Sequence, residues 1–174
     1  MKTIWLGAAV AALLSATAHA APPAGAADVA RGMSAYHHAD YAQAFADFRL
    51  GAMKGNAVAE YNLGIMYQQG QGVTQNYAKA FKWYRLAAAQ GYADAENNLG
   101  VMYAKGQSVP QDYVAAYKWY LIAKATMAAT SSHYAKVSNN VKQLPAMMTP
   151  AQIAQAQQEA SAWFAAHEPA GRVP

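Results

Sequence analysis

Two stretches of the sequence are copies of each other, displaced by 36 residues, and this repeat constrains the fold more than any other feature. Residues 59–67 read AEYNLGIMY, and residues 95–103 read AENNLGVMY. The same displacement pairs YAKAFKWYRLA at 77–87 with YVAAYKWYLIA at 113–123. A period of this length is typical of stacked helical hairpins, in which each unit buries its apolar face only against its neighbours. We therefore expect an all-α solenoid.

Each copy predicts two antiparallel helices joined by a loop. Apolar residues at spacings of three and four give each helix one apolar face. Gly70 and Gly106 stand where the first helix must end in a left-handed conformation. Asn76 and Asp112 then stand at the N-cap of the second helix, where a side-chain oxygen can accept from a free backbone N–H.

The repeat is flanked by weaker versions of the same pattern. A degenerate copy over 28–55 is expected to cap the stack, and the intact copies cover 56–91 and 92–127. Thr149, followed by a proline and then by Gln152, predicts the start of a last, capping helix. The expected organisation is a signal peptide at 1–20, a disordered linker at 21–27, the repeat domain at 28–127, C-terminal capping helices at 128–167 and a disordered tail at 168–174.

The N-terminus reads as a secretory signal peptide. Lys2 provides a short positive region, and Ile4 to Leu14 is an apolar run too short to span a bilayer comfortably. Ala18 and Ala20 supply the small residues of a cleavage site, so we expect cleavage after Ala20. The prediction is secretion across the inner membrane into the periplasm, with no stable membrane insertion after cleavage. An uncleaved N-terminal anchor is the alternative.

Composition narrows the classes of function. The chain has 13 Lys and Arg against 9 Asp and Glu, but the basic residues are scattered and form no stripe that would bind nucleic acid. It has no cysteine, so disulfides, thiol nucleophiles and a lipoprotein anchor are all excluded. Packing alone must hold the fold together.

Motifs of catalysis and metal binding are missing from the sequence. Ser-x-x-Lys, Gly-x-Ser-x-Gly and His-Glu-x-x-His do not occur. His37 and His38 are adjacent, so on a helix they point about 100° apart and cannot easily share one ion. We expect no catalytic residue, no cofactor and no metal, and therefore no enzyme.

The repeated motifs resemble Sel1-like repeats, which are related to tetratricopeptide repeats. The resemblance covers about residues 30 to 127. It implies a right-handed superhelix of helix pairs and a role as a protein interaction scaffold, here in the cell envelope. Some exported relatives are described as penicillin-binding or weakly β-lactamase-like, but these are rich in disulfides. A cell-wall-ligand or penicillin-binding protein is thus the alternative function, and a chaperone-like envelope protein without a fixed partner is a third.

Partner binding should use positions that the repeat itself does not need. By analogy with tetratricopeptide domains, residues beside the apolar stripe of each first helix would line a concave face that holds a protein or peptide. These positions differ between the copies, which fits either a surface that reads a partner or unconstrained drift. The oligomeric state is not set by the sequence. The candidate partner-binding residues are Tyr61, Ile65, Gln68, Gln69, Asn97, Val101 and Lys105.

Overall fold

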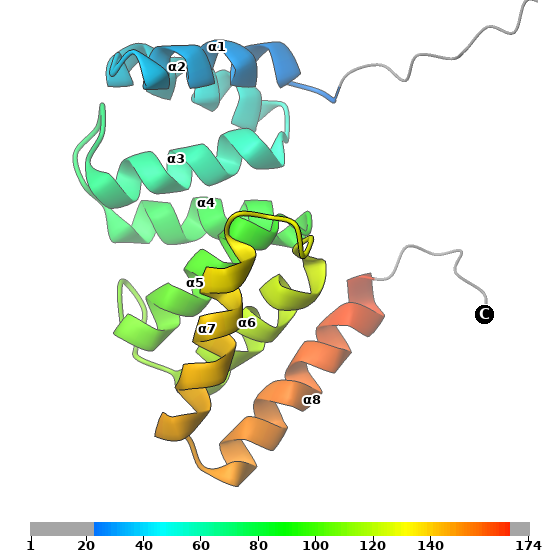
Figure 1. Cartoon of the computed structure of the whole chain (residues 1–174). Helices are drawn as coiled ribbons and strands as arrows, with labels where there is room; N and C mark the ends of the chain where they lie inside the picture. Colours follow the sequence, from blue (N-terminus) through cyan, green and yellow to red (C-terminus); the bar gives the residue numbers. More distant parts are fainter. Residues whose placement is uncertain (1–22, 168–174) are drawn as a thin grey trace, which may run out of the picture.

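The protein is a stack of helices, seen in a computed structural model that describes residues 23–167 (Figure 1). The predicted signal peptide at 1–20 and tail at 168–174 lie outside the described residues. No strand occurs between residues 23 and 167. The helices are α1 (Ala26–His37), α2 (Tyr41–Met53), α3 (Ala57–Gln69), α4 (Tyr77–Ala89), α5 (Ala93–Lys105), α6 (Tyr113–Thr126), α7 (Tyr134–Gln143), the short 3₁₀ helix η1 (Leu144–Met147) and α8 (Pro150–His167).

The first six helices form three hairpins that stack in chain order. Figure 1 shows α1–α2, α3–α4 and α5–α6 following one another from one end of the molecule, while α7 and α8 lie at the other end. The expected all-α solenoid with a capping helix is therefore confirmed. One boundary differs, because α1 begins at Ala26, inside the stretch predicted as a disordered linker at 21–27.

The capping residues predicted from the sequence lie at the helix ends and make the expected contacts. The side chains of Asn76 and Asp112 accept from the backbone N–H of the third helical residue, at 2.9 and 3.0 Å. Gly70 and Gly106 end α3 and α5 with φ of 71° and 65°, a conformation that costs residues with a Cβ about 1–2 kcal/mol. Thr149 and Gln152 form a reciprocal capping box at the start of α8.

A close contact between a glycine and an aromatic ring recurs in every hairpin. A Cβ on Gly64 would lie 2.4 Å from the Tyr84 ring, and one on Gly100 would lie 2.5 Å from the Tyr120 ring. The first hairpin repeats the contact between Gly32 and Phe48. The missing side chain lets the paired helices approach, and the ring fills the space between them. The degenerate cap is thus a complete hairpin with a shorter connection.

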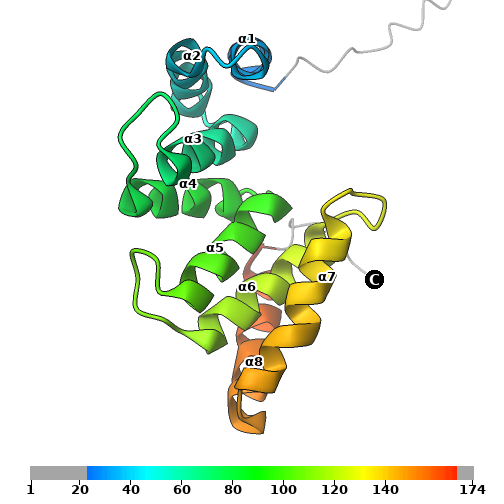
Figure 2. The same ribbon diagram turned by 60° about the vertical axis from the view of Figure 1, so that its left-hand side comes forward.

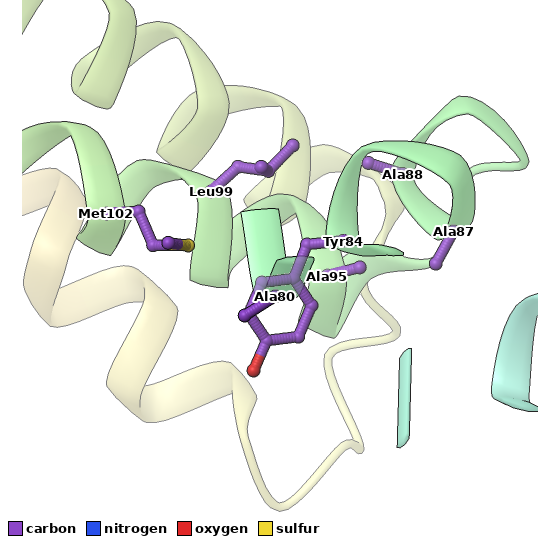
Figure 3. Packing of buried hydrophobic residues seen from close by; sticks show 7 residues of the cluster. All are labelled: Ala80, Tyr84, Ala87, Ala88, Ala95, Leu99 and Met102. Carbon is purple, nitrogen blue, oxygen red and sulfur yellow. The ribbon is translucent and has the colours of Figure 1, made fainter. Parts of the chain in front are cut away.

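The core continues from one hairpin to the next. Figure 3 shows Tyr84 and small residues of α4 together with Leu99 and Met102 of α5. A second cluster joins α2 to α3 around Phe48 and Leu63. Because each hairpin shares its core with its neighbours, the stack folds as one continuous unit.

The first hairpin has a polar outer side, as an end of the stack requires. Arg31 and Asp47 form an ion pair of 3.1 Å. Asp47 stands 36 residues before Trp83, which packs against the core in the following hairpin. No earlier hairpin covers this end within the described residues, so an ion pair suits the position better than a tryptophan.

The last two helices abandon the repeat and flank α6 (Figures 1 and 2). On α8, Ala156 and Ala160 are buried, as the apolar face of this helix predicts. Glu159 pairs with Lys118 of α6 at 3.3 Å, and Trp163 meets Trp119 edge to face. The shorter α7 packs across the ends of α5 and α6, where its Val137 is fully buried.

Candidate functional site

The first helices of the two full repeats and α7 enclose a hollow of about 380 Å³. We call it the α3–α5 hollow. It lies on the side of the stack formed by α3 and α5, the side that the analogy with tetratricopeptide domains predicts for binding. Its lining residues are Tyr61, Ile65, Gln68, Gln69, Asn98, Val101, Lys105 and Lys136.

Six of the seven candidate residues come together here. Four of them lie on successive turns of α3 and end at Gln69, while Val101 and Lys105 lie one turn apart on α5. The repeat frame explains the gathering, because side chains three or four residues apart share one helix face and the 36-residue period sets the two faces side by side. Whether a partner binds them stays a prediction.

Asn97 is the exception, and its expected place on the open face is wrong. Its side chain is only 4% exposed and accepts a hydrogen bond of 2.9 Å from Asn140 of α7. Asp94, one turn earlier on α5, meets His133 just before α7 at 2.7 Å. This part of α5 is therefore covered by α7, whereas the equivalent Tyr61 on α3 is half-buried and lines the hollow.

Two lining residues were missed by sequence reasoning. Asn98 has the same identity as Asn62 of the preceding copy, so a comparison of the two copies does not single it out as a variable position. Lys136 belongs to α7, where the 36-residue pattern has faded, so the repeat does not predict which face of this helix meets the hollow.

The middle of the hollow is aromatic and firmly held. The Tyr61 ring lies 4.9 Å from the Tyr92 ring and 5.9 Å from the Tyr84 ring, centre to centre. The Tyr84 hydroxyl donates to Gln68 Oε1 at 2.6 Å, which fixes the Gln68 amide. Burial raises the pKa of Tyr61 above its usual value, so its phenol stays protonated at neutral pH.

The buried acidic residues of the two full repeats have structural partners. Within residues 23–167 no three His, Asp or Glu side chains gather as a metal site would require. The buried Glu60 and Glu96 each accept from the end of the second helix of their own hairpin, from Gln90 and Thr126 respectively. The two hydrogen bonds occupy equivalent positions 36 residues apart, so they belong to the structure that the repeats share.

No helix between residues 23 and 167 combines the length and the apolar character needed to cross a bilayer.

Comparison with known proteins identifies the repeat. The sequence model of the Sel1 repeat matches residues 57–92 and 93–125. Both matches agree with the predicted copies, 56–91 and 92–127, to within two residues at each boundary. No protein of curated function matches this chain.

Solved structures agree with that match. A Sel1 repeat protein from Oxalobacter formigenes is 34% identical, with a TM-score of 0.57 over 59% of this chain and 82% of that one. The protein c5321, a protective antigen present in uropathogenic Escherichia coli strains displaying an SLR fold, is 27% identical with a TM-score of 0.69. That alignment covers 86% of this chain but 34% of c5321, so this chain spans about a third of its length. Because the Sel1 model matches both repeats and the Oxalobacter formigenes protein is 34% identical over most of its length, the chain belongs to the Sel1 repeat family.

Proposed function

We propose that this protein is an exported, non-catalytic adaptor that binds a segment of a partner protein in the α3–α5 hollow. Sel1 repeats generally mediate protein–protein interaction and typically form non-catalytic scaffolds. The observation that carries the proposal for this chain is the convergence of six variable residues on one hollow. The repeat places these positions on one face, and their aromatic ring, amides and lysine give that face groups that can bind a peptide.

The chemistry of the hollow supports a peptide rather than a flat protein surface. An apolar floor of Tyr61, Ile65 and Val101 can take aliphatic side chains, and the amides around it can pair with a peptide backbone. Its volume of about 380 Å³ suits a few side chains, not a folded domain.

Site-specific photocrosslinking in intact cells tests the binding. A photoreactive residue replaces Ile65 in the hollow or, as a matched control, Leu86, an exposed leucine on α4. We expect a defined adduct from position 65 that disappears when Gln69, at the rim, is changed to Glu together with Lys105→Glu, and no such adduct from position 86. Equal adducts from both positions, or none from position 65, would refute the assignment of the hollow.

Export is part of the same proposal and rests on the sequence from Lys2 to Ala20. N-terminal sequencing of the protein recovered from the periplasmic fraction should begin at Ala21. A cytoplasmic protein that retains Met1 would contradict export and place the partner in the cytoplasm.

A further inference from the structure

The α3–α5 hollow carries positive charge and no negative charge. Lys105, the last residue of α5, and Lys136, in the first turn of α7, both line it and are both exposed. Among residues 23–167 neither lysine takes part in an ion pair. None of the eight lining residues is Asp or Glu.

The acidic residues of the two lining helices are occupied elsewhere. Helix α3 contains Glu60, which is buried and accepts from Gln90. Helix α5 contains Asp94, which pairs with His133, and Glu96, which accepts from Thr126. None of these three carboxylates pairs with Lys105 or Lys136, although Asp94 lies near enough to Tyr61 for its charge to help raise the pKa of that phenol, so the two lysines can pair with an outside group.

The uncharged polar groups of the hollow also favour a ligand that accepts hydrogen bonds. Gln68 uses its carbonyl oxygen to accept from Tyr84, so its NH₂ group is the part that can serve a ligand. The protonated phenol of Tyr61 adds a further donor beside it. Two cations and several donors around an apolar floor match a ligand that carries both carboxylates and apolar side chains.

Building on the function proposed above, we propose that the occupant of the α3–α5 hollow is an acidic segment of a partner protein. Its carboxylates meet Lys105 and Lys136, and an intervening apolar side chain lies on Tyr61 and Val101. Because both lysines are exposed, each ion pair contributes modestly and is screened by salt. Recognition should therefore be moderate in affinity and sensitive to ionic strength.

Fluorescence anisotropy with the protein comprising residues 21–174 tests the proposal. The probes are a labelled decapeptide of alternating Glu and Leu and an analogue in which every Glu is replaced by Gln. The charge-reversal variant is Lys105→Glu with Lys136→Glu. Its matched control is Lys82→Glu with Arg85→Glu, the same change of net charge on exposed residues of α4. Circular dichroism melting confirms that both variants fold.

We expect the acidic peptide to bind at least tenfold more tightly than its Gln analogue, and to weaken severalfold between 50 and 300 mM salt. The variant of the hollow should lose at least tenfold in affinity, and the control should stay within twofold. Equal binding of the two peptides would overturn the proposal. So would an equal loss in both variants, since that would mean attraction to net charge alone.

Anionic membranes are the competing source of negative charge, and vesicles containing phosphatidylglycerol test them in parallel. If wild-type protein binds the vesicles through Lys105 and Lys136 while ignoring the acidic peptide, the inference is wrong. Failure here is distinct from failure of the proposed function. An adduct at Ile65 that survives Lys105→Glu with Lys136→Glu would retain the hollow as a binding site and reject an acidic occupant.

Discussion

The hairpins α3–α4 and α5–α6 have the same interior but different neighbours, and the comparison shows what the repeat fixes and what it leaves open. Inside, each places a glycine against a tyrosine ring and bonds a buried glutamate to the end of its second helix. Outside, α3 faces the open hollow, while the beginning of α5 lies under α7. The position occupied by Tyr61 in one copy and Asn97 in the other therefore serves a surface in the first and a packing contact in the second. The place of a residue within the repeat fixes the helix face on which it lies. The place of that repeat within the stack determines whether the face is open or covered.

The largest expected effect probes the shared interior. Gly64→Ala and Gly100→Ala should each lower the free energy of unfolding by about 2 kcal/mol, as overpacking of a dense core typically does, despite the gain in helix propensity. The added Cβ meets the ring of Tyr84 or Tyr120, both buried. Urea denaturation measures the loss, which should be equal in the two variants.

Gly55→Ala provides the control for this pair. Gly55 has a φ of 75° and nothing within 4 Å of an added Cβ, so its variant isolates backbone strain, worth about 1 kcal/mol. A difference above about 1 kcal/mol between Gly64→Ala and Gly100→Ala would break the claim that the two interiors are equivalent.

The second expected effect is on the pH dependence of stability, which should differ between the two hairpins because of their buried glutamates, Glu60 and Glu96. Burial raises the pKa of Glu96 from 4.5 to about 7, and its Oε1 has no hydrogen-bond partner among residues 23–167. Glu60 is shifted in the same direction. Glu96 is fully buried, and near it Tyr134 and Val137 of α7 pack in one cluster with Ala93, one turn away on α5.

A raised pKa in the folded state means that the protonated acid favours folding. The stability contributed by protonated Glu96 is present below about pH 4.5, falls as the pH rises through 7 and is absent above it. Glu96→Gln should therefore match wild type at pH 4 and be more stable by about 1–2 kcal/mol at pH 8. Urea denaturation of both proteins across this range measures the difference, and Glu60→Gln should show a smaller one. A difference that does not depend on pH would mean that folding leaves the pKa of Glu96 at its ordinary value.

The same comparison shows how far sequence reasoning reaches in this molecule. The 36-residue displacement, the caps at Asn76 and Asp112 and the place of Ile65 on an open face all follow from local periodicity and chemistry, and the structure agrees. The burial of Asn97 does not follow from them, because it depends on where α7 packs. Tyr134, Val137 and Val141 give α7 an apolar face that packs on the core, but the 36-residue repeat does not extend to this helix and so cannot predict where that face lies on the stack. Lys136 was missed for the same reason.

The smallest effect tests whether α7 is held on α5 as the contacts indicate. Asn140→Ala removes the hydrogen bond to the buried Asn97 and should cost about 1 kcal/mol, the typical loss when a buried acceptor loses its partner. Amide hydrogen exchange should accelerate in α7 and at the start of α5 but not in α3, because α7 covers the start of α5 through Asn97 and makes no such hydrogen bond to α3 among residues 23–167. Asn139→Ala, at the adjacent exposed position, is the matched control and should leave both stability and exchange unchanged. If Asn140→Ala loosened α3 as much as α5, the cover over α5 would not be what distinguishes the two hairpins. Their different surfaces would then have to arise from Tyr61 and Asn97 themselves.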